Sequence, residues 1–285
     1  PVRMLFISEH SRSGVVGRVF GFMNMMWPMG NIIGPTIGGY LADVYGWGYA
    51  FYATALLFLL GLPPLLMIKD VKAPSQGSES ENTYLQLFKA RDLRRSVMAF
   101  SMVQLLSGAS ISLANLVIPL YLTSRFGMTK TMVGFYFSVG GGLAMLLAQI
   151  PSGVLTDRYG GKRIMLWFLA LIPTSFIIYP FVTDYYVLLV IYMAISGFRS
   201  ATWPASMSYI INLVPRPMRG AAIGVRQTSI RLGFTLGPFL GGLLWQFFDA
   251  HASFYAAGIV SAISVLLTFI LKEGEPKYSE VRAPS

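Results

Sequence analysis

The chain has 285 residues, of which 54% are hydrophobic and only 12% are charged. A soluble domain carries about a quarter of its residues charged, and a disordered chain is poor in aromatic residues, so this composition excludes both classes. Because the chain has no cysteine, disulfides, Cys-ligated metals and thiol catalysis are excluded as well. The mean hydropathy of +0.59 predicts an integral membrane protein.

Apolar runs of about 20 residues recur along the chain, which is the length that an α-helix needs to cross a bilayer. The short alternating segments of a β-barrel do not occur, so the expected fold class is all-α and polytopic. A polar segment at 69–95 predicts a cytoplasmic linker with a short interfacial helix over Tyr84–Phe88, and 272–285 predicts a cytoplasmic tail. The predicted spans are 19–42, 48–68, 96–122, 132–156, 164–182, 185–212, 220–246 and 252–271.

The net charge of +10 comes from basic residues that gather on one side of these spans. Seventeen of the 22 lie in the two terminal segments and the turns of one side, whereas the other side holds only Arg125 and Lys130. The positive-inside rule therefore predicts a multi-pass protein of the cell (plasma) membrane with both termini in the cytoplasm. The excess charge indicates topology and contact with the lipid bilayer, not binding to nucleic acid.

A ten-residue pattern occurs twice, 203 residues apart, as GNIIGPTIGG and GFTLGPFLGG. At the same offset Phe51-Tyr52-Ala53 recurs as Phe254-Tyr255-Ala256, which indicates an internal duplication and a two-half transporter. Small residues at such positions also let neighbouring membrane helices approach closely. The shared positions are Gly30, Gly34, Pro35, Gly38 and Gly39 in the first copy and Gly233, Gly237, Pro238, Gly241 and Gly242 in the second.

A second motif, GVLTDRYGGKR, begins at the end of the fourth predicted span, and its marked positions are Gly153, Asp157, Arg158, Gly160, Lys162 and Arg163. Gly153 is expected to allow close helix packing and Gly160 a tight turn. It resembles the cytoplasmic loop motif of the major facilitator superfamily, and the repeated Gly-Pro pattern resembles the antiporter motif in that family's fifth helix. The resemblance implies a twelve-helix transporter that works by alternating access. It also implies that the loop latches the two halves together on the cytoplasmic side and that the Gly-Pro motif serves gating and prevents leak.

The resemblance and the repeat together predict a major-facilitator-type bundle with 8 of the expected 12 transmembrane helices. Residues 1–68 correspond to helices 5 and 6 at the end of the N-terminal half, and 69–95 to the linker. Residues 96–271 correspond to the six-helix C-terminal half, helices 7 to 12. The first four helices are expected upstream of the chain.

Polar residues at membrane depth are the candidates for a substrate cavity, since a charge at a helix centre usually faces a cavity or a partner. Arg199 shares one helix face with Tyr192, Ser196 and Trp203, and span 96–122 carries a similar stripe with Gln104 and Asn115. The resemblance favours a cavity role, because the family's seventh and tenth helices line the central cavity. The alternative is that these groups only bond to neighbouring helices. Arg231 is a further candidate, whereas Arg226 is expected to snorkel to the interface.

No Asp or Glu lies in the middle of a span, and no metal, cofactor or catalytic motif occurs in the sequence. The predicted function is secondary active transport of a small organic solute by proton-coupled efflux, with the proton carrier in the missing helices. An anionic solute is favoured by the arginines, and a monomer is expected for the full-length protein. Uptake of an organic anion by uniport or symport, and a non-transporting scaffold or signalling role, remain alternatives. A membrane enzyme is not expected.

Overall fold

A computed structural model describes residues 16–67 and 91–271 of the chain. The predicted interfacial helix at Tyr84–Phe88 and the predicted tail at 272–285 lie outside the described residues. The described end of the predicted linker is already helical, since α6 begins at Arg91. The linker bounds of 69–95 stay a prediction, because a membrane helix can begin with a charged turn outside the apolar layer.

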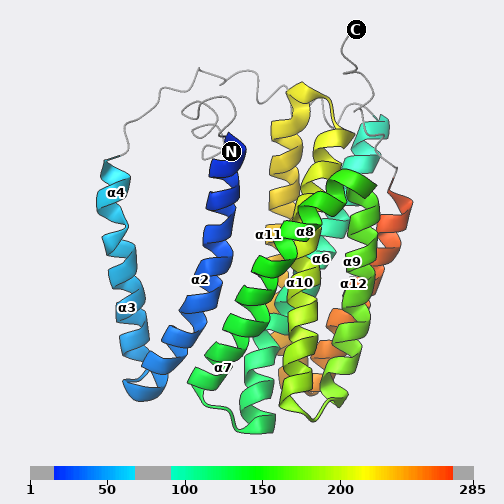
Figure 1. Ribbon diagram of the computed structural model, residues 1–285. Helices are drawn as coiled ribbons and strands as arrows, with labels where there is room; N and C mark the ends of the chain where they lie inside the picture. Colours follow the sequence, from blue (N-terminus) through cyan, green and yellow to red (C-terminus); the bar gives the residue numbers. More distant parts are fainter. Residues whose placement is uncertain (1–15, 68–90, 272–285) are drawn as a thin grey trace.

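Helices occupy the described chain almost completely, and each of the eight predicted spans corresponds to one helical segment (Figure 1). The prediction of an all-α bundle is thus confirmed. A π-helical turn, η1, and a 3₁₀ turn, η2, extend two of the segments. The elements are α2 (Val16–Val44), α3 (Trp47–Leu60), α4 (Leu62–Leu66), α6 (Arg91–Phe126), α7 (Lys130–Phe137), η1 (Ser138–Leu143), α8 (Ala144–Tyr159), α9 (Gly161–Ile178), η2 (Tyr179–Phe181), α10 (Tyr185–Leu213), η3 (Arg216–Met218), α11 (Arg219–Phe247) and α12 (Ala250–Ile270).

Six of these segments are long and apolar enough to cross a membrane. They are Trp47–Pro64, Leu93–Phe126, Lys130–Gln149, Gly161–Phe181, Tyr185–Leu213 and Ala250–Ile270. The remaining two long helices, α2 and α11, have 29 residues each and are not among these six spans. At 1.5 Å per residue each of them is also about 43 Å long, which exceeds the thickness of the hydrocarbon layer.

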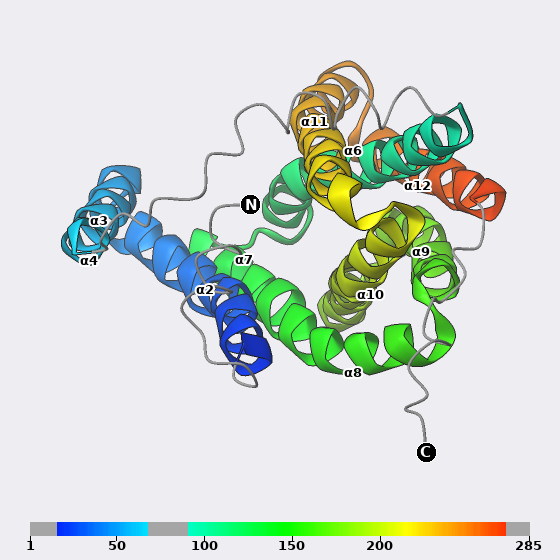
Figure 2. The same ribbon diagram turned by 90° about the horizontal axis from the view of Figure 1, so that it is seen from above.

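The helices form two parts. The segments from α6 to α12 make a bundle, whereas α2 and α3 stand at its side and α2 packs on α7 and η1 (Figures 1 and 2). No residue of α3 is buried, so this helix presents most of its surface outward in the structure. The bundle is therefore the packed body of the described chain, and α2 is the element that joins α3 to it.

The turns alternate between the two ends of the bundle (Figure 1). The α8–α9 and α10–α11 turns and the start of α6 share one end, which we call the basic end. Their basic residues are Arg91, Arg94, Arg95, Arg158, Lys162, Arg163, Arg216 and Arg219. The opposite end holds Arg125 and Lys130, where α6 is followed by α7. The structure thus brings together at one end the turns that the charge pattern assigns to one side.

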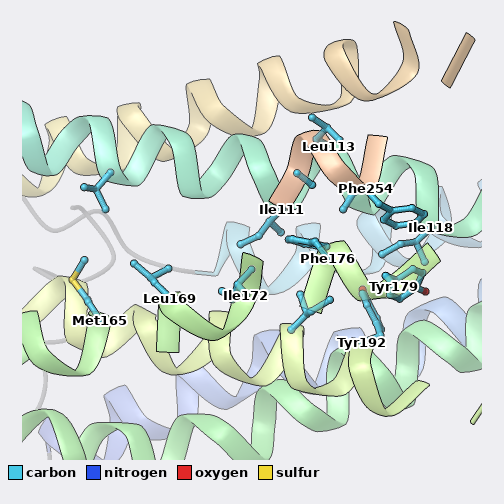
Figure 3. Packing of buried hydrophobic residues seen from close by; sticks show 14 of the residues in the cluster. Ile111, Leu113, Ile118, Met165, Leu169, Ile172, Phe176, Tyr179, Tyr192 and Phe254 are labelled. Atoms are coloured by element: carbon cyan, nitrogen blue, oxygen red, sulfur yellow. The ribbon is translucent and has the colours of Figure 1, made fainter. Parts of the chain in front are cut away.

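The interior of the bundle is a layer of aliphatic and aromatic side chains between α6, α9, α10 and α12 (Figure 3). Tyr179 and Phe254 lie 4.7 Å apart between ring centres. The hydroxyl groups of Tyr136 and Tyr179 are 2.7 Å apart, and Tyr136 also donates to the Leu188 carbonyl at 2.8 Å. Such polar contacts matter here because lipid supplies no hydrophobic drive for helix association, so packing and interhelical hydrogen bonds have to hold the helices together.

Glycine determines how α11 lies on α6. A Cβ atom at Gly233 or Gly237 would clash with the α6 backbone, and one at Gly241 would lie 2.8 Å from the Leu113 carbonyl oxygen. From the α6 side, a Cβ at Gly108 would lie 2.7 Å from the Ile230 carbonyl oxygen. The two backbones therefore touch along three turns, which only glycine permits.

The first copy of the same repeat, in α2, has a different environment. Its positions Gly30, Gly34 and Gly38 match Gly233, Gly237 and Gly241, yet a Cβ at any of the three would meet nothing within 4 Å. We call these three positions the open glycine face of α2. The next residue, Gly39, does touch a neighbour, since a Cβ there would clash with the Lys130 carbonyl. The two copies thus share a sequence, but only the α11 copy has its helix partner among the described residues.

The two copies provide a matched pair of substitutions. We expect Gly237→Ala to destabilise the chain by about 1–3 kcal/mol, because the new methyl group would overlap Ser112 and the Ala109 carbonyl. Gly34→Ala also precedes a proline within a helix, but it enters open space and should leave the chain's stability within about 0.5 kcal/mol. Thermal unfolding of the purified 285-residue chain in detergent would measure both. Equal losses in the two variants would contradict the packing described here.

Candidate functional site

Arg199 lies near the middle of α10 and is half-buried against α8. Its Nη2 atom is 3.3 Å from the sulfur of Met145, and the neighbouring Ser200 hydroxyl donates to the Met145 carbonyl at 3.0 Å. A thioether is a weak acceptor and carries no charge. Helix α8 therefore holds Arg199 in place, but this contact does not neutralise the positive charge of its guanidinium.

Tyr192 and Ser196 precede Arg199 on the same face of α10, and both are buried. The Tyr192 ring stacks on Tyr136 at 5.1 Å, and a Cβ at Gly140 would lie 2.6 Å from the Tyr192 ring. These contacts place Tyr192 against η1 and α7. Its predicted place in a substrate cavity stays a prediction, and in the described structure it is part of the helix packing.

Arg226 differs from the expectation that it snorkels to the interface. Its side chain is only 1% exposed, its Nη2 donates to the Ser206 hydroxyl at 2.7 Å, and its guanidinium carbon lies 4.3 Å from the centre of the Trp203 ring. The expectation was wrong because Arg226 lies on the side of α11 that packs on α6 and α10. There the guanidinium is enclosed by protein and cannot extend along the helix to water.

The predicted stripe of α10 is therefore divided between two neighbours. Arg199 and Tyr192 contact α8, η1 and α7, whereas Trp203 and Ser206 contact Arg226 of α11. On α6, Gln104 is buried and Asn115 is half-buried. The structure thus brings Trp203 together with an arginine that the sequence had not assigned to the site.

Arg231 lies on another side of α11 and is exposed. It lines an open hollow of about 320 Å³ together with Gln227, Thr228, Leu232 and Thr235. This hollow faces away from the α6 contact, so the structure does not bring Arg231 to Arg199 or Trp203. Its polar lining of an amide, two hydroxyl groups and a guanidinium is suited to hydrogen bonds with a polar ligand.

The loop motif forms the turn between α8 and α9 at the basic end. Gly160 has a φ of +85°, which confirms the expected tight turn, since this conformation favours glycine. Lys162 donates to the Phe269 carbonyl on α12 at 3.3 Å, and the Arg158 guanidinium lies 5.3 Å from the Tyr159 ring centre. Asp157 is exposed, and Arg163 follows Lys162 in the first turn of α9.

The expected packing role of Gly153 is absent from the described part of the chain, because a Cβ there would meet no atom within 4 Å. The position that does allow close approach is Gly161. A Cβ at Gly161 would lie 2.5 Å from the Ala205 carbonyl oxygen of α10. The loop motif therefore uses its second adjacent glycine, not its first, to seat α9 on α10.

Asp43, which the sequence did not single out, connects α2 to the bundle at the end opposite the basic end. Its carboxylate accepts hydrogen bonds from the backbone N–H groups of Lys130 and Thr131 at 3.0 and 2.7 Å, and from the Thr131 hydroxyl at 2.6 Å. The Lys130 ammonium in turn donates to the Ala42 carbonyl at 3.0 Å. Because the first N–H groups of a helix have no partner within it, Asp43 of α2 caps the start of α7.

The same hydrogen bonds affect the ionisation of Asp43. The Thr131 hydroxyl and then the Thr131 backbone N–H lower the pKa of this carboxyl group from its ordinary 3.8 to about 2. A lowered pKa means that the contact contributes stability above pH 3.8 and loses it as the pH falls through about 2. Asp43 therefore holds α7 across the whole physiological range of pH.

Two turns before Asp43 in α2, Thr36 contacts Ser138 at the start of η1. The Thr36 hydroxyl donates to the Ser138 hydroxyl oxygen at 2.8 Å, and the Thr36 backbone N–H lies 3.3 Å from the same oxygen. Glycines flank this contact on the bundle side, since a Cβ at Gly134 would clash with the Pro35 carbonyl and one at Gly142 would lie 2.5 Å from the Ile32 nitrogen. The α2–α7 contact is thus close along its length and polar at two points.

Among residues 16–67 and 91–271, no three His, Cys, Asp or Glu side chains are grouped so that they could hold a metal ion. The acidic residues in this part of the chain stand at helix ends. Asp184 and Asp249, for example, cap the starts of α10 and α12, accepting from Val187 and Ala252 at 3.0 and 2.8 Å.

The family model described as Major Facilitator Superfamily matches residues 1–105 and 100–285. The uncharacterized MFS-type transporter YuxJ of Bacillus subtilis is 26% identical over 280 residues, which are 96% of this chain and 70% of that protein. The multidrug resistance protein MdtG of Proteus mirabilis is 24% identical over 245 residues, 85% of this chain and 60% of MdtG. The multi-drug resistance efflux pump PmrA of Streptococcus pneumoniae is 27% identical over 185 residues, 63% of this chain and 46% of PmrA. The chain thus spans less than two thirds of the latter two relatives.

The α2–α7 contact can be tested by a disulfide, because the chain has no other cysteine. We expect Thr36→Cys with Ser138→Cys to form a bridge on mild oxidation, since the two side-chain oxygens that the sulfur atoms replace are 2.8 Å apart. Loss of two maleimide-reactive thiols would measure the bridge. The control is Gly38→Cys with Ser138→Cys, in which the first thiol points into open space. A bridge that forms equally fast in the control would contradict the contact.

Removing the carboxylate of Asp43 should loosen the same contact. In the Thr36→Cys, Ser138→Cys background, we expect Asp43→Ala to slow bridge formation several-fold, because the N–H groups of Lys130 and Thr131 lose their acceptor. Asp43→Asn keeps one acceptor oxygen and should give an intermediate rate. The rate of thiol loss under fixed oxidant measures the effect. An unchanged rate in Asp43→Ala would show that glycine packing alone holds α2.

Proposed function

Because the chain belongs to the major facilitator superfamily, we propose that the protein is a secondary active transporter that moves a small organic solute across the cell membrane by alternating access. The relatives named as multidrug resistance proteins and efflux pumps favour export as the direction. The repeated Gly-Pro motif of the antiporter type supports proton coupling. As the described acidic residues stand at helix ends, the proposal places the proton-carrying group outside the described chain.

The observation that carries the proposal is the presence of guanidinium and aromatic groups at mid-membrane depth in α10. Arg199 has no charged partner in the described residues, and Trp203 is 41% exposed on the same helix face. A charge at this depth is costly unless it has a function or a partner. We place Arg199 and Trp203 in the solute pathway, with Gln104, Asn115, Tyr192 and Ser196 as further candidates. Arg231, which lines a separate hollow on α11, is a second candidate position for the solute.

We further propose that residues 91–271 are one complete six-helix half and that α2 and α3 are the last two helices of the other half. The open glycine face of α2 supports this division. In the second copy of the repeat, the equivalent glycines of α11 pack on α6, the first helix of its half. By the duplication, a helix equivalent to α6 would cover Gly30, Gly34 and Gly38 in the whole transporter.

Gating in this proposal uses contacts at both ends of the membrane. The Asp43 and Thr36 contacts join α2 to α7 and η1 at and near the end opposite the basic end. The α8–α9 loop, with Asp157, Arg158, Lys162 and Arg163, belongs to the basic end, which we assign to the cytoplasm together with both termini. Opening one end while the other stays closed is what alternating access requires.

Uptake of an organic anion is the second candidate function. It is favoured by Arg199, Arg226 and Arg231, three positive charges within helices whose described acidic residues lie only at the helix ends. The two candidates differ in direction and in coupling, so one transport assay separates them.

Transport by the full-length protein in proteoliposomes tests the proposal. We expect flux of a small organic solute to increase at least several-fold when a pH gradient is imposed. Arg199→Ala should reduce flux of an anionic solute at least about tenfold, since it removes a charge from the pathway. The control is Arg94→Ala, an exposed arginine at the start of α6. Flux that ignores the gradient would contradict antiport, and unchanged anion flux in a folded Arg199→Ala variant would contradict the role of Arg199.

A further inference from the structure

Arg226 has more hydrogen-bond donors than the surrounding protein satisfies. Its Nη2 donates to Ser206, but its Nε and Nη1 atoms are buried and have no hydrogen-bond partner among the described residues. A guanidinium carries five N–H groups and no acceptor, and buried polar groups of this kind are nearly always paired in proteins. The unpaired nitrogens therefore point to a missing acceptor.

Two further unsatisfied groups lie at the same depth on α6. The Gln104 Nε2 atom and the Ser101 hydroxyl oxygen are buried without a hydrogen-bond partner in the described chain. Together with Arg226 they form what we call the buried donor cluster. Each of the three side chains can donate a hydrogen bond, and neither Arg226 nor the Gln104 Nε2 atom can accept one.

The helix register places the members of this cluster together. Arg226 lies one turn before Ile230, on the α11 face that meets α6, and Ile230 and Gly233 touch Gly108. Ser101 lies two turns before Gly108 on the matching face of α6, and Gln104 lies between them. The Phe100 and Tyr209 rings, 5.1 Å apart, bring α6 next to α10 at this level. The cluster thus sits where α6, α10 and α11 converge.

No negative charge among the described residues balances Arg226. The acidic residues of this part of the chain are Asp43, Asp92, Asp157, Asp184 and Asp249, and all of them stand at helix ends. A buried charge without a counter-charge is strongly unfavourable, and its cost falls when an anion with good geometry pairs with it. The missing acceptor is therefore expected to be negatively charged.

Trp203 separates this cluster from the face of α10 that we assign to the solute pathway. Its ring lies 4.3 Å from the guanidinium carbon of Arg226, while 41% of the side chain is exposed. A cation–π contact of this kind partly stabilises the positive charge of Arg226, but it gives the N–H groups no hydrogen-bond acceptor. Because Trp203 is this exposed, we expect that a change of its rotamer can uncover Arg226 without moving a helix.

We propose that the buried donor cluster binds the carboxylate of an organic solute when Trp203 turns away from Arg226. This inference deepens the proposed transport function and rests on it for the pathway that brings the solute to Trp203. A carboxylate accepts hydrogen bonds through both oxygens, so it complements a set of donors that includes a fixed positive charge. A neutral amide lacks the negative charge of a carboxylate, and the Arg226 guanidinium would repel a cation. The cluster therefore binds carboxylic acids in preference to their neutral and basic analogues.

The test uses the fluorescence of Trp203 in the purified chain, with Trp27, Trp47, Trp167 and Trp245 replaced by Phe. We expect butyrate to shift the Trp203 emission and to increase its quenching by acrylamide in a saturable way, because the indole leaves the guanidinium. Butyramide and butylammonium at the same concentrations should have no effect. Arg226→Gln should weaken the butyrate response at least about tenfold, since it removes the charge, whereas Arg94→Gln, at an exposed arginine near the start of α6, should retain it.

Each outcome decides the inference. A butyrate response that butyramide reproduces, or that survives Arg226→Gln, overturns it, and so does the absence of any response to butyrate in the folded protein. If Arg226→Gln does not fold, Gln104→Leu replaces it and should weaken the response several-fold. Binding of butyrate without transport by the full-length protein would contradict the proposed function but not this site. Transport by the full-length protein without a butyrate response would contradict this site but not the proposed function.

Discussion

Close contact between helix backbones is the constraint on which the rest of the structure depends. Apolar side chains gain little by leaving lipid for protein, so helices in a membrane associate through packing and hydrogen bonds. In this chain Gly233 and Gly237 let α11 reach the backbone of α6, and Gly134 lets α7 reach α2. These contacts set the distances between helices, and the polar side chains at the candidate site meet because the distances are short.

Hydroxyl groups strengthen the contacts that glycine permits. Ser110 donates to the Ala257 carbonyl at 2.7 Å, and Ser264 lies 3.1 Å from the Val103 carbonyl oxygen and 2.7 Å from the Ser107 hydroxyl. These bonds join α6 to α12 at three points of the interior. The bundle from α6 to α12 is therefore tied together by polar contacts within it, while α2 is joined to it through α7 and η1. This difference in attachment is consistent with two parts that move relative to each other.

The sequence predicted those features that depend on one helix at a time. The eight helical segments and the turn at Gly160 follow from hydropathy, length and the backbone freedom of glycine. All of them were found, and six of the segments are long and apolar enough to cross a membrane. Features that depend on two helices far apart in the chain were not predicted. Asp43 was overlooked because its partners lie 87 and 88 residues away. The burial of Arg226 was missed because a helical wheel shows which residues share a face but not which neighbour covers that face.

The π-helical turn η1 has a consequence for how the protein can divide. Its Gly140 meets Tyr192 of α10, and its Gly142 meets the α2 backbone at Asn31 and Ile32. On one side of the turn α7 is fastened to α2, and on the other side α8 is packed on α10. A π-helical turn is a local irregularity in the hydrogen-bond ladder of a helix. A movement of α2 relative to α10 would therefore be taken up within this one membrane span, because its first half packs on α2 and its second half on α10.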